Sequence, residues 1–206
     1  MHDAQAMVLS SSPRSGGNSD LAAELFARGI ERAGGQCRVL HLRDFVVRPC
    51  IGCHFCARDE QSRCILSPDT GKEKDSDDQT DEVFSLLSQA RFIALSAPIY
   101  FYHLPAGFKA LIDRAQRFYA AREKGVAPPR KAGTGYSILV AGRTRGEQLF
   151  AGSVLTLKYF LEPQGFSMAE PLLLRGLDAQ SDLKQSPEAS AQVEEYGHMA
   201  WVSSLR

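Results

Sequence analysis

The sequence has no excess of charge of either sign. Its 206 residues include 24 lysines and arginines, which are balanced by 24 aspartates and glutamates. Proteins that bind nucleic acid or an anionic membrane surface usually carry a basic stripe or a polybasic segment, and the sequence has neither. We therefore expect neither nucleic acid nor a membrane among the partners.

Long apolar runs are also absent. No stretch reaches the roughly 20 apolar residues of a membrane-spanning helix, and the apolar run near the N-terminus is too short for a signal peptide. We expect a protein of the reducing cytoplasm, where unpaired thiols persist. A chain of this length fits one domain, residues 1–206, with a core that needs no disulfides.

Cysteine is scarce, yet four of the five cysteines fall within fifteen residues in the pattern C-x2-C-x2-C-x7-C: Cys50, Cys53, Cys56 and Cys64. A compact thiolate run plus one further cysteine is the usual ligand set of an iron–sulfur cluster. A zinc site, a disulfide pair and uncommitted thiols are the alternatives, although structural zinc sites more often pair two separated C-x2-C knuckles. We interpret Cys37, alone in an apolar run, as a core residue.

Apolar runs alternate with helical patterns along the chain. We expect strands at 6–10, 37–42, 92–98, 136–142 and 166–176, and helices at 19–33, 82–87, 106–119, 150–161 and within 185–206. This alternation predicts an α/β fold, with a doubly wound, five-stranded parallel sheet in the order 2-1-3-4-5. The segment 46–81 interrupts the pattern after the second strand. We call it the cysteine excursion; its acidic run 72–82 is interpreted as a solvated loop.

The loop after the first strand, SSPRSGGNS, has the character of a phosphate site. Its glycines allow backbone N–H groups to approach an anion, and Asn18 and Ser19 stand at a helix N-terminus, where the dipole favours negative charge. Arg14 adds a planar set of donors. The loop lacks the P-loop lysine and the dinucleotide G-x-G-x-x-G pattern, so it suits a mononucleotide. The alternative is an ordinary turn with an N-cap.

Two further loops follow the third and fourth strands. The first, SAPIYFYHLPAG, places aromatic and apolar side chains at a strand end, where flat surfaces suit a planar ring. The second, AGRTRGEQ, is polar and flanked by glycine, and its backbone could follow the ring's hydrogen-bonding edge. Packing under a loop and a plain connection are the alternatives. A phosphate cradle, an aromatic shelf and a polar edge together indicate FMN.

These motifs, with SAPIYFYHLPAGFKALIDR, resemble the NADPH-dependent FMN reductase family, specifically its iron–sulfur flavoproteins, from Met7 to about Gly176. The resemblance implies a flavodoxin-like fold and a [4Fe–4S] cluster on the four clustered cysteines. It also implies FMN contacts from Ser12, Arg14, Gly17, Asn18, Ser19, Pro98, Ile99, Tyr100, Phe101, Gly142, Arg143 and Thr144.

The expected function is that of an FMN-dependent oxidoreductase. It would pass electrons between FMN, the cluster and an external partner such as NAD(P)H, ferredoxin, a quinone or a flavin, and we predict no side chain as a catalytic acid or base. One alternative is a cluster-free NAD(P)H-dependent flavin or quinone reductase. Another is a redox-sensing or partner-binding flavin or zinc module without turnover. A homodimer or homotetramer is expected from the resemblance and from the apolar residues Phe45, Phe55 and Ile65.

Overall fold

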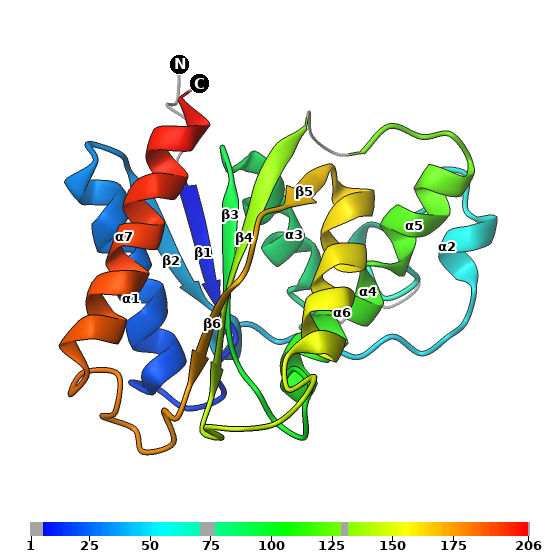
Figure 1. The fold of residues 1–206 in the computed structure, drawn as a ribbon. Coiled ribbons are helices and arrows are strands. Elements are labelled where there is room, and N and C mark those ends of the chain that lie inside the picture. Colours follow the sequence, from blue (N-terminus) through cyan, green and yellow to red (C-terminus); the bar gives the residue numbers. More distant parts are fainter. Residues whose placement is uncertain (1–5, 71–76, 129–131, 206) are drawn as a thin grey trace.

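The computed structural model describes residues 6–70, 77–128 and 132–205, whose strands form one parallel sheet (Figure 1). The strand order is β2-β1-β3-β4-β5, with β6 also paired to β4. The strands are β1 (Ala6–Ser10), β2 (Cys37–His41), β3 (Ile93–Pro98), β4 (Gly133–Ala141), β5 (Phe166–Met168) and β6 (Leu172–Arg175). The predicted α/β class and the order 2-1-3-4-5 are confirmed.

The predicted fifth strand is present in two pieces. β5 pairs with the beginning of β4, at Gly133–Gly135, and β6 pairs with its end, at Ile138–Ala141. The break falls at residues 169–171, where Pro171 has no N–H to donate to a sheet ladder. Both pieces run parallel to β4, so the sheet has six strands and the predicted topology.

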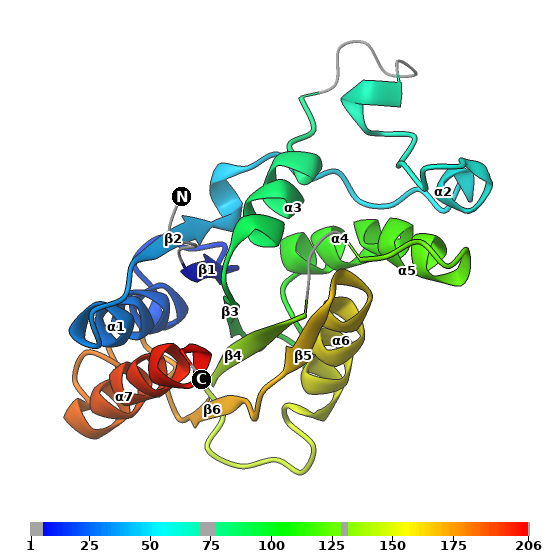
Figure 2. The ribbon, with the colours of Figure 1, turned by 90° about the horizontal axis from the view of Figure 1, so that it is seen from above.

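Helices cover both faces of the sheet (Figure 2). Along β1, Ala6 and Val8 belong to the core beneath α1 and α7, whereas Met7 and Leu9 belong to the core on the opposite face. This alternation follows from the two-residue period of a strand. The helices are α1 (Asn18–Arg32), α2 (Phe55–Arg58), α3 (Thr80–Gln89), α4 (Ala106–Arg114), α5 (Gln116–Glu123), α6 (Ala151–Leu161) and α7 (Pro187–Ser204).

Two glycines allow α1 and α7 to pack in close contact. A Cβ atom on Gly29 would lie 1.9 Å from the carbonyl oxygen of Glu194, and one on Gly197 would lie 2.0 Å from that of Phe26. Any side chain at either position would therefore force the helices apart. α7 begins as predicted, because the Ser186 hydroxyl accepts a hydrogen bond from the backbone N–H of Ala189.

The cysteine excursion leaves the sheet after β2 and returns at α3. Its two ends are joined at the root: the Gln79 N–H donates to the Val46 carbonyl (2.7 Å), and the Val46 N–H donates to the Gln79 side chain (3.0 Å). Its single-turn helix α2 lies beside α5 (Figures 1 and 2). The single helix predicted over 106–119 is instead two helices, α4 and α5, which meet at Ala115.

Part of the predicted acidic loop, residues 71–76, lies outside the described residues. Across the ranges that the structure describes, no helix has the length and apolar character needed to span a bilayer.

Candidate functional site

The loop between β1 and α1, residues 11–17, forms a cradle at the helix N-terminus; we call it the phosphate loop. Gly17 is the N-cap of α1, and the backbone turns through Gly16 with a φ of +67°. The predicted ligands Ser12, Asn18 and Ser19 are buried in its floor, whereas Arg14 is on the exposed rim. The first N–H groups of a helix have no partner within the helix, so they are available to an anion here.

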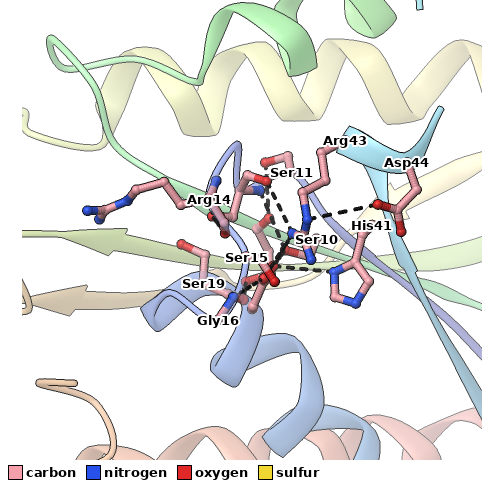
Figure 3. A network of polar contacts seen from close by, with 12 residues as sticks. Ser10, Ser11, Arg14, Ser15, Gly16, Ser19, His41, Arg43 and Asp44 are labelled. Atoms are coloured by element: carbon pink, nitrogen blue, oxygen red, sulfur yellow. Dashed lines mark hydrogen bonds and ion pairs between the residues drawn. The ribbon is translucent and has the colours of Figure 1, made fainter. Parts of the chain in front are cut away.

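A buried carboxylate, Asp20, lies beneath this loop and was not predicted. It accepts hydrogen bonds from the Ser10 hydroxyl (2.5 Å), the Gly16 N–H (2.9 Å) and the Arg43 guanidinium (3.0 Å). Figure 3 labels these three donors. Burial acts to raise the pKa of Asp20, but the hydrogen bonds from Ser10, Arg43 and Gly16 outweigh it, and the pKa is lowered. The carboxylate therefore stays ionised and holds the loop in shape before any ligand binds.

The guanidinium group in contact with the phosphate loop belongs to Arg43, not to the predicted Arg14. Arg43 bonds Asp20 and lies 3.4 Å from the Ser12 carbonyl oxygen, while the Arg14 side chain extends away from this network (Figure 3). Parallel pairing places the end of β2 next to the end of β1, with His41 opposite Ser10. Arg43, two residues beyond His41, thereby reaches the loop across the sheet.

Asn18 ties the phosphate loop to the segment that follows β6. Its side-chain amide donates to the carbonyls of Leu177 (3.2 Å) and Ala179 (2.8 Å), and its oxygen accepts from the N–H of Leu183 (3.0 Å). Gln180 reaches back from this segment and donates to the carbonyl of Ser15 at 3.2 Å. The amide of Asn18 is therefore committed to residues 177–183, which leaves the backbone of Asn18 for an anion.

A pocket of about 410 Å³ opens at the carboxyl ends of β3 and β4; we call it the ring pocket. It brings four of the predicted flavin contacts to one wall: Ile99, Phe101, Gly142 and Arg143. The predicted Pro98, Tyr100 and Thr144 do not line it. Tyr102 and Ala141 also line it and belong to the two loops predicted to face the ring, whereas the lining residues Leu149 and Asp178 were not predicted.

The turn over the ring pocket has a strained backbone. Tyr100 and His103 exchange two backbone hydrogen bonds, of 2.8 and 2.9 Å, and the residues between them have positive φ: Phe101 at 49° and Tyr102 at 63°. Two positive φ angles are typical of a type I′ turn, which glycine and asparagine usually occupy. The Phe101 side chain is fully exposed, at 103%. Strain that presents an aromatic ring at a pocket is typical of a ligand site.

The other three clustered cysteines lie near Cys56. Burial raises the pKa of the Cys56 thiol, and negative charge on Cys64, Cys50 or Cys53 raises it further, which places all three thiols near it. None of the four is in a disulfide. Within the described part of the chain, no three of these side chains already have the arrangement of a metal site. The donor set suits an iron–sulfur cluster, but bringing the four sulfurs into position would require local adjustment.

A second pocket, of about 550 Å³, has Cys50 and Cys56 in its wall and α5 opposite them. Lys124, just after α5, donates to the carbonyls of Cys56 (3.1 Å) and Asp59 (2.5 Å) and to the Ser62 hydroxyl (3.1 Å). One cation thus anchors three points of the cysteine excursion. Sequence patterns gave no signal for this residue, since it stands sixty or more positions away from its partners.

Comparison with known proteins identifies the family. Residues 5–146 match the sequence profile of the NADPH-dependent FMN reductase family, which is more than half of the chain and includes the phosphate loop, the cysteine excursion and Gly142–Thr144. The chain belongs to this family. The match confirms the resemblance seen in the motifs.

This family member is also similar to curated iron–sulfur flavoproteins. It is 31% identical to one from Methanocaldococcus jannaschii over 108 residues, covering 52% of this chain and 50% of that one. It is 29% identical to one from Methanosarcina thermophila over 140 residues, covering 68% and 64%. An Archaeoglobus fulgidus relative is 23% identical over 193 residues, covering 93% and 79%. The chain matches about half to two thirds of the length of the first two relatives.

Solved structures share the fold. A flavone reductase superposes with a TM-score of 0.70 at 14% identity, covering 98% of this family member and 63% of that chain. An NAD(P)H:quinone oxidoreductase from Methanothermobacter marburgensis gives 0.69 at 16% identity, covering 96% and 94%. An archaeal flavodoxin gives 0.58 at 13% identity, covering 98% and 99%. These similarities confirm the flavodoxin-like fold.

Proposed function

We propose that this protein is an FMN-dependent oxidoreductase that passes electrons between FMN, a [4Fe–4S] cluster and an external donor or acceptor. One observation carries the flavin assignment. The phosphate loop and the ring pocket lie at the same end of the sheet and are joined by residues 177–183, which contact the loop through Asn18 and the pocket through Asp178. A single mononucleotide suits both.

The phosphate group would bind at the N-terminus of α1. The hydroxyl of Ser19 and the backbone N–H groups of Gly17 and Asn18 are the proposed donors, and the helix dipole favours the anion. The Ser12 hydroxyl donates to the Arg14 carbonyl at 2.7 Å and would turn from it to reach the phosphate. Asp20 brings a negative charge beneath this position. Arg43, which forms an ion pair with it at 2.8 Å, offsets that charge, and Arg14 adds a cation at the rim.

The flavin ring would occupy the ring pocket. Ile99 and Phe101 supply apolar surface, with Pro98 and Tyr100 beside them, and the backbone of Gly142–Thr144 supplies polar groups along one edge. Arg143 donates to the Tyr102 hydroxyl at 3.1 Å, which links the two loops over the pocket. Bound FMN supplies hydride and single-electron chemistry, while the residues around it orient the ring and exclude water.

The cluster would be held by Cys50, Cys53, Cys56 and Cys64, and it supplies one-electron transfer when bound. Three observations support this ligand set: the thiols are free, they lie near one another, and the curated relatives are named iron–sulfur flavoproteins. Iron would bind these cysteines as thiolates, so cluster assembly would release their protons.

A second candidate function is a cluster-free NAD(P)H-dependent flavin or quinone reductase. It is favoured by the lack of a preformed three-residue metal group among the described residues. In either case we propose NAD(P)H, ferredoxin, a quinone or a flavin as partner, and residues 1–206 as one FMN-binding domain. We further propose a homodimer or homotetramer, and a location in the cytoplasm, where cluster and thiols are protected from oxidation.

Anaerobic purification and reconstitution with FMN, iron and sulfide test this proposal. We expect flavin absorption bands, a broad charge-transfer shoulder at roughly 400 nm that overlaps them, and iron and acid-labile sulfide in the ratio of one cluster per chain. Rapid mixing with NADH, NADPH and reduced ferredoxin should then identify the reductant that bleaches the flavin. Flavin bands without iron would favour the second candidate, and a colourless protein would overturn both.

A further inference from the structure

A buried ion pair closes the root of the cysteine excursion. Arg114, at the end of α4, lies 2.7 Å from the carboxylate of Asp78, and both side chains are 1% exposed. Arg114 also donates to the Arg48 carbonyl at 3.0 Å, while Asp78 accepts from the N–H groups of Arg48 and Thr80, each at 3.0 Å. The pair therefore holds the chain where it enters the excursion and where it leaves.

These contacts use only one side of the guanidinium group. Both recorded hydrogen bonds of Arg114 come from Nη1, whereas Nε and Nη2 are buried and have no hydrogen-bond partner among the described residues. A guanidinium has five N–H donors. Leaving a buried donor unpaired is unfavourable, and more so for a charged group. Such an arrangement points to an acceptor that arrives later.

The candidate acceptor is the sulfur of Cys64. The chain just after Cys64 turns back over α5, because the Ser67 N–H donates to the Cys64 carbonyl (3.0 Å) and the Ser67 hydroxyl accepts from Arg117, one turn beyond Arg114. Burial lowers the pKa of Arg114, but the Asp78 carboxylate and the charge of Cys64 outweigh it and raise that pKa. Cys64 therefore acts on the Arg114 guanidinium, and the unpaired Nε and Nη2 are the donors available to its sulfur.

We propose that Arg114 is a positioning residue for the cluster, donating a hydrogen bond from Nε or Nη2 to the Cys64 thiolate and thereby raising the cluster's reduction potential. This inference rests on the proposed function. A hydrogen bond to a ligand sulfur withdraws electron density, so it stabilises the more negative, reduced cluster. By contrast, Arg58 and Lys124 contact the backbone carbonyls of Cys53 and Cys56.

The test compares Arg114→Lys with Arg117→Lys in reconstituted protein. Lysine at 114 keeps a positive charge against Asp78 but has a single nitrogen, so it cannot serve the carboxylate and the sulfur in the same way. Arg117 lies one turn away and bonds Asp81 and Ser67, which makes it a matched control. The readout is the midpoint potential of the cluster, followed by electron paramagnetic resonance during a redox titration.

We expect Arg114→Lys to make cluster reduction about tenfold less favourable, a shift of about 59 mV to lower potential for a one-electron couple. Arg117→Lys should leave the potential near that of the wild type. Equal potentials in the wild type and in Arg114→Lys would overturn the inference. Wild-type protein that takes up no iron and sulfide would instead remove the proposed cluster itself, so the two failures are distinguishable.

A measurement on the wild type covers the case in which Arg114→Lys does not assemble a cluster. Arginine labelled with ¹⁵N in its guanidinium group is incorporated, and the reduced cluster is examined by pulsed electron paramagnetic resonance. We expect a nitrogen coupling that changes between ¹⁴N and ¹⁵N arginine. A cluster-bearing wild type without such a coupling would overturn the inference.

Discussion

The phosphate loop and the cysteine excursion are held in shape in different ways. The phosphate loop is short and joins a buried strand to a long helix, and its own neighbours Ser10, Gly16 and Asp20 fix it from below. The described part of the excursion has two short helical turns, Phe55–Arg58 and Pro68–Thr70, and is held by long cationic side chains from other elements, chiefly Arg114 and Lys124. The first site is therefore formed before its ligand binds, whereas the second, if it holds the proposed cluster, would be completed by that cluster.

The strongest test of this difference is to remove one cysteine. We expect Cys53→Ser to abolish iron binding and to leave FMN bound at one per chain, because the excursion contributes no residue to the ring pocket. Iron analysis and flavin absorbance on the same sample measure both.

Cys37→Ala is the control for this experiment. Burial, with a contribution from the charge of Glu31, raises the pKa of Cys37 to about 12, so its thiol stays protonated and is a poor ligand. This variant should keep its iron. Loss of FMN together with iron in Cys53→Ser would show that the two sites are not independent.

The next largest effect is expected at the root of the excursion. Asp78→Ala leaves the charge of Arg114 buried without its partner, which should lower the free energy of unfolding by about 3–5 kcal/mol. Urea denaturation followed by circular dichroism measures the change.

The neighbouring Asp77 provides the control, because its ion pair with Arg48 is exposed. Asp77→Ala should change the free energy of unfolding by no more than about 1 kcal/mol. Similar losses in both variants would contradict a special role for the buried pair.

A smaller effect on FMN binding should distinguish Arg43, which contacts the phosphate loop, from Arg14, which belongs to it. Arg43→Gln should weaken FMN binding by about 10- to 100-fold, because it removes charge-assisted hydrogen bonds worth roughly 1.5–3 kcal/mol and leaves Asp20 uncompensated beneath the anion. Arg14→Gln, at the exposed rim, should weaken binding less. Flavin fluorescence titration measures both affinities, and the reverse order would favour Arg14 as the main phosphate ligand.

The smallest effect concerns pH. Because the pKa of Asp20 is lowered in the folded state, its stabilising contribution is complete above the pKa of an unfolded aspartate, about 3.9, and is lost as the pH falls toward the lowered value. Asp20→Asn should reduce stability by about 1–3 kcal/mol at pH 7. The difference between the two proteins should shrink below about pH 4. A difference that stays constant from pH 7 to pH 3 would contradict this assignment.

The sequence predicted most of the fold because its signals are local. The apolar run at 6–10 is bounded by polar residues, so the bounds of β1 were predicted as observed. Gly34 and Gly35 follow α1, and the predicted helix 19–33 agrees with its observed bounds to within one residue at each end. The break between α4 and α5 was missed, since neither glycine nor proline marks Ala115. The split of the last strand was not predicted, because only three residues, 169–171, separate the apolar pieces β5 and β6.

The site was predicted only where its residues are close in sequence. The ring pocket contains the predicted Ile99, Phe101, Gly142 and Arg143, each on a loop at a strand end. Asp178 was missed because it reaches the pocket from a segment whose local pattern carries no ligand signal. Arg43, likewise, contacts the phosphate loop only because two distant strands are paired. Such contacts follow from tertiary packing, which no local spacing records.

The close crossing of α1 and α7 has a consequence for how the protein matures in the cell. Hydrogen bonds from Asn18 join the start of α1 to residues 177–183, and Gly197 of α7 packs closely against the same helix at Phe26. A nascent chain that has emerged only as far as β6 therefore possesses every proposed phosphate donor but lacks the clamp that fixes them. We therefore expect nucleotide loading to follow the synthesis of residues 177–197 and their packing against α1.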